Sequence, residues 1–236
     1  PDIATVDFSQ LKFSGAGGMA MTTSVAEEWE RVTACEIIQG YGLTECSPVI
    51  AVNIPGAVRL GTVGPVVPET EIRIVDDEGL DVPKGEKGEL WVRGPQVMLG
   101  YWQQQQATAE TITADDWLKT GDYVQIDADD YLSIVDRKKD MILVSGFNVF
   151  PTEIEDWLSR HPDVLECAAI GVANERTGES VKLFVVPRGR DIAEQELIAH
   201  CKQGLTAYKI PREIVFVADL PKSNIGKILR RELREI

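Results

Sequence analysis

The hydrophobic pattern of the 236-residue chain changes twice, and these changes limit the folds that it can adopt. Residues 1–55 combine short apolar stretches, one amphipathic stretch and glycine-rich turns, which is typical of a strand–helix–strand unit. From about residue 56, apolar and polar residues alternate in EIRIV and ELWVRG, between the turn sequences DDEG and PKGEKG. This alternation predicts antiparallel hairpins in a small, twisted, β-barrel-like sheet that extends to about Val135.

Residues 137–236 interleave strands with helices. MILVSG, AAIGVA, KLFVVPR and IVFVADLP read as strands. FPTEIEDWLSRHP predicts a helix with Pro151 in its first turn, and AEQELIAHCKQGL predicts a second helix that Gly204 closes. The predicted fold class is therefore α/β over residues 1–136 (an α/β portion at 1–55 and a barrel-like portion at 56–136), followed by a compact α+β domain at 137–236.

The first segment contains the most specific local expectations. A strand at Leu11–Phe13 is expected to run into the glycine-rich loop Gly15–Gly18, and a second strand is expected near Glu36–Ile38. Ser24 followed by Glu27 has the spacing of a capping box, so a helix is expected to begin there.

Charge and composition exclude several classes of function. The net charge is −14, with −15 in residues 1–136 and +1 in residues 137–236, which argues against nucleic-acid binding. Two histidines are too few for a multi-histidine metal site, and a histidine-dependent hydrolase is disfavoured. The four cysteines lack CxxC spacing and fit reduced thiols in a cytosol. Without a signal peptide or a long apolar run, a cytoplasmic location is expected.

Four polar stretches contain residues suited to nucleotide chemistry, although each also has a purely structural interpretation. Residues 41–45, YGLTE, place a hydroxyl beside a carboxylate, which suits phosphate and Mg²⁺, but also suits a helix cap. Residues 119–122, KTGD, end in an aspartate that could accept two ribose hydroxyls, or form a turn.

The other two stretches are basic. Residues 136–140, DRKKD, could contact a nucleotide or form a solvated charge run. Residues 221–227, PKSNIGK, lack the first glycine of a P-loop and have Ile228 where a P-loop has Ser or Thr, so they are not a Walker A motif.

Taken together and in this order, these stretches resemble the adenylate-forming superfamily, and most closely the bacterial long-chain fatty-acid–CoA ligases. The similarity includes DDWLKTGDYVQIDADDYLSIVDRKKDMILVSGFNVFPTEIE, GPQVMLGYW and LPKSNIGKILRREL, and it covers essentially the whole chain. One departure is Asp116, where the family signature usually has glycine. The Ser/Thr/Gly-rich phosphate loop of the family has no counterpart in residues 1–40, so the chain resembles the C-terminal part of a longer enzyme.

The resemblance implies a reaction in two steps, in which ATP and a fatty acid give acyl-AMP, and CoA then gives the thioester. Gly15, Ala16 and Gly17 would line the adenylate and the acyl group. Tyr41 and Gly42 would border the adenine.

It also implies sites for the phosphates, the metal and the ribose. Thr44 would hold phosphate and Glu45 would hold Mg²⁺. Asp122 would grip the ribose hydroxyls with help from Arg137, and Ile134 is expected to contact the nucleotide.

In the second domain, which the resemblance implies is mobile, three residues have expected roles. Lys227 would be a cation delivered to the reacting carboxylate and phosphate. Lys139 would mark the hinge, and Gly146 would leave room for the pantetheine of CoA.

Some alternatives stay open on the sequence alone. An adenylation domain that loads a carrier protein and a non-catalytic binding fragment are the rival functions. A peripheral contact with the inner membrane face and a dimeric state are also left open, and we expect the chain to be inactive by itself.

Overall fold

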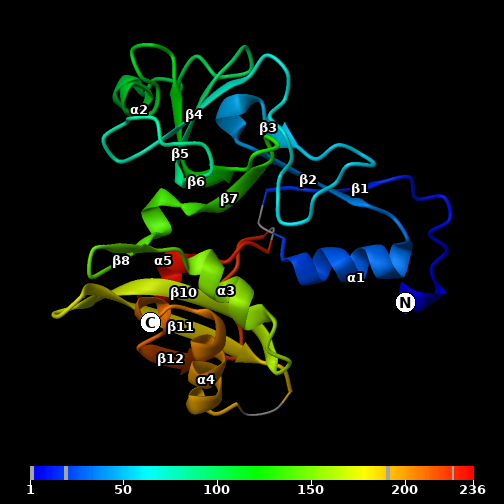
Figure 1. Cartoon of the computed structure of the whole chain (residues 1–236), viewed down its shortest axis with the longest axis vertical. Coiled ribbons are helices and arrows are strands. Elements are labelled where there is room, and N and C mark those ends of the chain that lie inside the picture. Colours follow the sequence, from blue (N-terminus) through cyan, green and yellow to red (C-terminus); the bar gives the residue numbers. More distant parts are fainter. Residues whose placement is uncertain (1–2, 19–20, 190–191, 225) are drawn as a thin grey trace. The chain divides into compact units, whose positions relative to one another are not determined.

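The computed structural model describes residues 3–18, 21–189, 192–224 and 226–236. The chain divides into two compact units, Pro1–Val135 and Asp136–Ile236, and most of their helices and strands are labelled in Figure 1. None of the described helices is long and apolar enough to cross a membrane.

The first unit begins with a β–α–β arrangement and a third strand. Its elements are β1 (Ser14–Ala16), α1 (Thr23–Thr33), β2 (Ile37–Gly42) and β3 (Val49–Val52). β1 pairs with β2 in parallel, and β2 pairs with β3 in the antiparallel sense. The indole N–H of Trp29 donates to the Ser14 hydroxyl (3.0 Å), which links α1 to β1.

Two local expectations in this region are corrected. The first strand lies at Ser14–Ala16 rather than Leu11–Phe13, because Leu11 and Phe13 are exposed and have no core to join. Helix α1 has Thr22 as its N-cap and makes no side-chain capping bond, so the Ser24–Glu27 capping box is wrong. The Ser24 hydroxyl instead lies 3.1 Å from the Thr22 hydroxyl.

A four-stranded sheet forms the rest of the first unit. Its elements are β4 (Glu71–Val75), β5 (Gly88–Arg93), α2 (Gln105–Thr111), β6 (Leu118–Ile126) and β7 (Leu132–Arg137). Its strand order is β4-β5-β6-β7, so the predicted hairpins are present, but among the described strands the sheet is open and does not close into a barrel. One apolar core joins this sheet to β3: Cys46, Ile50, Ala51, Leu90, Val92, Leu118, Val124 and Leu132.

The second unit is a mixed sheet with helices, as expected for an α+β domain. Its elements are β8 (Ile142–Val144), β9 (Phe147–Val149), α3 (Pro151–Ser159), β10 (Val164–Asn174), β11 (Gly178–Pro187), α4 (Glu194–Gly204), β12 (Glu213–Phe216) and α5 (Arg230–Leu233). The strand order is β10-β11-β8-β9, and β12 pairs with β11 in parallel. Alternate residues of β10 belong to two different apolar clusters, so the sheet has a core on each face.

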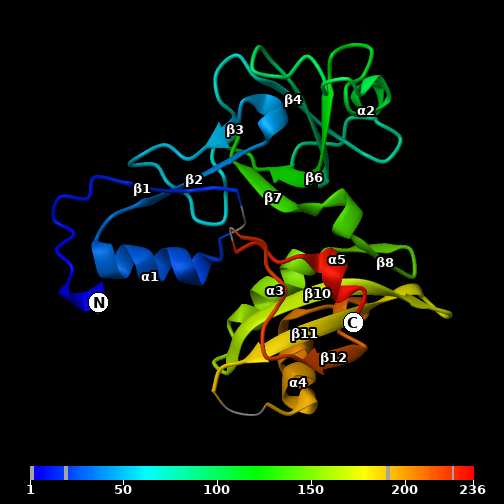
Figure 2. The ribbon, with the colours of Figure 1, turned by 180° about the vertical axis from the view of Figure 1, so that it is seen from behind.

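Those two cores involve different helices. Ile154 and Leu158 of α3 and Leu197 of α4 pack with Cys167 and Ala169 on one face of β10. Alternate residues of β10, Ala168 and Ile170, pack with Leu220 and Leu233 of the C-terminal segment on the other face, and Figure 2 shows α5 beside β10. The sheet is thus covered on both sides within this unit.

Candidate functional site

The phenol of Tyr41 and the carboxylate of Asp122 meet, although they lie 81 positions apart in the sequence. The Tyr41 hydroxyl donates to Asp122 Oδ2 at 2.6 Å. Burial, together with the negative charge of Asp122, raises the pKa of the Tyr41 phenol far above its ordinary value. Tyr41 therefore stays protonated and acts as a donor, which joins the YGLTE and KTGD stretches into one site.

Neighbouring residues hold Asp122 in place. It lies on β6, directly after Gly121, whose φ of +70° favours glycine. The Asp122 amide donates to the Thr120 hydroxyl (3.1 Å), which in turn donates to the Leu90 carbonyl (2.8 Å). Asp122 is only 5% exposed, so its position is set by the fold rather than by solvent.

Gly15 and Ala16 lie in strand β1 rather than in the predicted glycine-rich loop, and with Gly17 they lie beside the residues that lead into the YGLTE stretch. In the parallel pair, Gly15 is opposite Ile38 and Ala16 is opposite Gln39. The carboxyl ends of parallel strands are where α/β folds bind ligands. These three residues and Tyr41 therefore lie at the same edge of the small sheet.

Gly42 is required by close backbone packing. A Cβ added at Gly42 would overlap the Pro48 carbonyl, so only glycine fits. Gly15 is different, because a Cβ added there would meet nothing within 4 Å and its backbone is not in the left-handed region. Glycine at position 15 therefore has no structural explanation within the described residues.

Thr44 and Glu45 lie on the 3₁₀ helix Thr44–Cys46, just beyond β2. Thr44 is exposed, and Glu45 Oε1 accepts the Tyr101 hydroxyl at 2.7 Å. The same bond, with Tyr101 as its donor, raises the pKa of the Tyr101 phenol. The backbone of Glu45 is also held in place, because its carbonyl accepts the Met98 amide at 2.8 Å.

Tyr101 is a site residue that sequence reasoning missed. It belongs to the GPQVMLGYW stretch, but its phenol contacts a residue 56 positions away, and no local pattern signals such a pair.

The chemistry of Glu45 and Thr44 fits a magnesium ion held mainly by phosphates. Mg²⁺ in nucleotide enzymes uses one or two carboxylates and completes its shell with phosphate oxygens and water. Over residues 3–18, 21–189, 192–224 and 226–236, no group of three or more His, Cys, Asp or Glu side chains could hold a metal alone. A bound nucleotide would have to supply most of the ligands.

Ile134 lies on β7 and packs against the same core as Tyr41 and Leu43. Its side chain is partly buried and joins this apolar core. Arg137 is the last residue of β7, and its amide donates to Asp136 Oδ1 at 2.8 Å. Asp136 Oδ2 accepts the Thr152 amide (2.8 Å) and so caps the start of α3.

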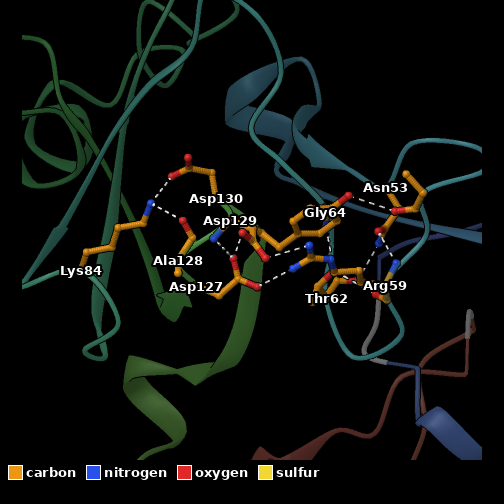
Figure 3. A network of polar contacts seen from close by, with 11 residues as sticks. Asn53, Arg59, Thr62, Gly64, Lys84, Asp127, Ala128, Asp129 and Asp130 are labelled. Atoms are coloured by element: carbon orange, nitrogen blue, oxygen red, sulfur yellow. Dashed lines mark hydrogen bonds and ion pairs between the residues drawn. The ribbon is translucent and has the colours of Figure 1, made fainter.

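The acidic turn at residues 127–130 serves a structural purpose (Figure 3). Arg59 binds Asp127 (3.1 Å) and Asp129 (2.9 Å) through its two terminal nitrogens. Lys84 binds Asp130 at 2.6 Å. Hydrogen bonds from the backbone amides of Tyr131 and Asp129 lower the pKa of Asp127. The carboxylates of this turn therefore organise surface loops, and we assign no ligand to them.

In the second unit, Gly146 lies at the tip of the β8–β9 hairpin. Ser145 (φ 52°) and Gly146 (φ 83°) form a two-residue turn between the paired residues Val144 and Phe147. A Cβ added at Gly146 would meet nothing within 4 Å. Space beside this backbone is therefore open within the unit.

Lys227 lies on a closed turn near the C-terminus. The Ser223 amide donates to the Lys227 carbonyl (2.8 Å), and the Lys227 amide donates to the Ser223 hydroxyl (3.2 Å). The PKSNIGK stretch also contains Ile225, which lies outside the described residues. Lys139, the expected hinge residue, is exposed on the 3₁₀ helix Lys138–Asp140.

Each unit thus groups part of the predicted set. The first unit brings together the residues expected to bind nucleotide: Gly15, Ala16, Gly17, Tyr41, Gly42, Thr44, Glu45, Asp122 and Ile134. The second unit contains the residues with expected roles in the mobile domain: Lys139, Gly146 and Lys227. Arg137 lies at the start of the second unit.

Two models of known protein families match the chain, one in each unit. The family model described as AMP-binding enzyme matches residues 2–102, and the model described as AMP-binding enzyme C-terminal domain matches residues 153–227. A long-chain-fatty-acid–CoA ligase of Yersinia pestis is 54% identical over 98% of this chain, and one of Bacillus subtilis is 39% identical over 100%. The chain spans only 41% and 42% of these two relatives.

Solved structures show the same fold. An anthranilate CoA ligase in complex with anthranoyl-AMP matches 99% of this chain with a TM-score of 0.87 and 36% identity, over 47% of its own length. The amide bond synthetase McbA from Marinactinospora thermotolerans matches 100% of the chain with a TM-score of 0.91 and 33% identity, over 49% of its own length. With both family models matched in order and a shared fold at this identity, the chain belongs to the AMP-binding enzyme family.

Proposed function

We propose that this chain is the C-terminal part of an AMP-forming long-chain fatty-acid–CoA ligase. The identity of 52–54% to several such ligases supports the substrate class. The observation that carries the proposal is the hydrogen bond between Tyr41 and Asp122, because it assembles two nucleotide-suited stretches into one buried polar site.

The first step forms acyl-AMP. A fatty carboxylate is ionised at pH 7, so it needs no general base. Its oxygen attacks the α-phosphorus of ATP, and pyrophosphate leaves with the bonding electrons. The protein contributes positioning and charge neutralisation: Lys227 offers a cation, and Thr44 a hydroxyl donor to phosphate.

The nucleotide is held by the first unit. Asp122 accepts the ribose hydroxyls with help from Arg137, while Ile134 contacts the nucleotide. Tyr41 and Gly42 border the adenine. The Gly15–Gly18 loop lines the adenylate and the acyl group. Glu45 would hold Mg²⁺, which when bound neutralises phosphate charge.

The second step forms the thioester. The sulfur of CoA, as its thiolate, attacks the acyl carbonyl carbon, and AMP leaves. Gly146 leaves room for pantetheine, and rotation of residues 137–236 about Lys139 exchanges Lys227 for Gly146 at the reacting centre.

Lys227→Ala tests this assignment in a complete ligase that contains this chain, or in one made by grafting the chain onto the rest of a 54%-identical relative. Pyrophosphate–ATP exchange should slow by about 10²–10³-fold, corresponding to roughly 3–4 kcal/mol for one lost electrostatic contact. Thioester formation from supplied acyl-AMP should change far less.

The matched control is Lys202→Ala, which removes an exposed lysine on α4. It should leave both steps unchanged. Equal damage to both steps by Lys227→Ala would contradict the role of Lys227. Transfer to a carrier protein with no turnover of free CoA would instead identify a carrier-loading adenylation domain.

A further inference from the structure

The turn that contains Lys227 leads directly into Arg230, and it is also held by Lys222, whose Nζ lies 2.6 Å from Glu166 Oε2 on β10. The Leu229 amide donates to the Pro221 carbonyl (2.8 Å), and Lys222 and Ile228 form a β-bridge, so the two arms of the turn are closed. Helix α5 begins immediately afterwards, at Arg230. The position of the Lys227 turn is therefore set by two anchors, the Lys222–Glu166 ion pair and the contacts of Arg230.

Arg230 is held by a buried glutamate of another element. Its NH2 donates to both carboxylate oxygens of Glu155 on α3, at 2.8 and 2.7 Å. Glu155 Oε1 also accepts the Ala169 amide of β10 at 2.8 Å. The two side chains are 19% and 17% exposed, and burial raises the pKa of Glu155.

The same arginine reaches the segment that contains Lys139. Its NH1 lies 3.8 Å from Asp140 Oδ2, and the NH2 of Arg234 lies 3.5 Å from Asp140 Oδ1. The Asp140 side chain is 11% exposed and closes the 3₁₀ helix Lys138–Asp140. One carboxylate next to the expected hinge thus faces two cations of the C-terminal tail.

Stability alone is a weak reason for this arrangement. Replacing a buried ion pair with apolar residues is often neutral or stabilising, because desolvation offsets the attraction. Here Arg230 Nε is buried with no hydrogen-bond partner among the described residues, which adds to the cost. What the ion cluster supplies, and an apolar cluster would not, is fixed geometry among α3, the hinge segment and the tail.

We propose that Arg230 and Asp140 are positioning residues, which make the hinge segment 138–140 and the Lys227 turn move as one body. Arg230 anchors the turn to α3 through Glu155, and Asp140 ties the hinge segment to Arg230 and Arg234. When the backbone rotates at Lys139, the Lys227 turn then moves by the same rotation. The proposal rests on the proposed role of Lys227 in forming acyl-AMP.

The mechanical part is tested on this chain by amide hydrogen exchange. In Arg230→Lys, which keeps the charge but loses the second terminal nitrogen, the Leu229 and Met141 amides should both exchange at least about tenfold faster. In Asp140→Asn, Met141 should exchange faster while Leu229 stays protected. Arg231→Gln, at an 82% exposed neighbour, should change neither. Unchanged exchange at Met141 in both variants would overturn the coupling.

The functional part is tested in the complete ligase. Asp140→Asn should lower kcat of acyl-AMP formation about tenfold with KM for ATP within twofold, and Asp140→Glu should restore most of the loss. A normal kcat in Asp140→Asn, beside a strong defect in Lys227→Ala, would refute the positioning role alone. A normal rate of acyl-AMP formation in Lys227→Ala would instead refute the proposed function. The amide exchange of Arg230→Lys and Asp140→Asn would then decide whether the hinge segment and the turn are coupled.

Discussion

At the scale of single residues, a substitution at Gly146 tests whether the open space beside its backbone is needed for the thioester step. Gly146→Leu places a side chain in the open region beside the β8–β9 turn and should block thioester formation while pyrophosphate exchange continues. Gly189→Leu is the control, because Gly189 has a φ of +80° and equally open surroundings. Both variants bear the same left-handed backbone cost of about 1–2 kcal/mol. If Gly189→Leu lost the thioester step too, or Gly146→Leu kept it, the channel assignment would be wrong.

Cys46 makes the first unit sensitive to alkaline pH. Burial raises the pKa of this thiol from 9.0 to about 11. Between these values the unfolded chain loses the thiol proton and the folded chain keeps it. The unfolded state then binds fewer protons, so the free energy of unfolding falls as pH rises through this window, by roughly 2–3 kcal/mol.

Urea unfolding at pH 8 and pH 10.5 measures this effect. Cys46→Ala should be less stable than the parent at pH 8 but should lose less stability between the two pH values. A variant and parent with parallel pH profiles would show that the thiol does not contribute.

At the scale of elements, the packing of α4 on α3 depends on Gly204. A Cβ added at Gly204 would overlap the ring of Trp157, whose indole N–H donates to the His200 carbonyl at 3.0 Å. Gly204→Ala should therefore destabilise the second unit by about 1–3 kcal/mol, although alanine favours helix. Gln203→Ala, one exposed position earlier, should stay within about 0.5 kcal/mol of the parent. Denaturation midpoints that moved equally would contradict the steric account.

Elements with a buried face were predictable and those without one were not. Pro151 and the apolar residues Ile154 and Leu158 predicted α3, because the periodicity and the helix start agreed. Helix α2 was missed because none of its residues is buried, so its sequence shows no apolar stripe. The end of α4 at Gly204 was predicted from the helix-stop preference of glycine, but contact with Trp157 is what excludes a side chain there.

The candidate site divides in a similar way. Local sequence motifs identified Tyr41, Glu45 and Asp122 as candidate residues, but their hydrogen-bond partners come from far along the chain. Strands β2 and β6 bring Tyr41 to Asp122, whereas Tyr101 and Glu45 lie outside the strands and meet through the packing of the first unit. Such pairs depend on tertiary packing, which local periodicity does not encode.

At the scale of the whole molecule, we expect the 236-residue chain alone to form no acyl-CoA. It spans 41% of the Yersinia pestis ligase, and it contains no Ser/Thr/Gly-rich phosphate loop. A radiolabelled acyl-CoA assay with the purified chain, ATP, Mg²⁺, CoA and a long-chain fatty acid should give background product only. The grafted complete ligase is the positive control, and acyl-CoA made by the chain alone would contradict the expectation.

The two kinds of glycine in the first unit carry different information about selection. Position 42 can hold nothing larger, because the Pro48 carbonyl occupies the space, so any lineage must keep glycine there merely to fold. Conservation of glycine at position 42 would therefore give no evidence that the protein is catalytically active. Position 15 is free of that requirement, so a lineage that gave up the reaction would be free to vary there first.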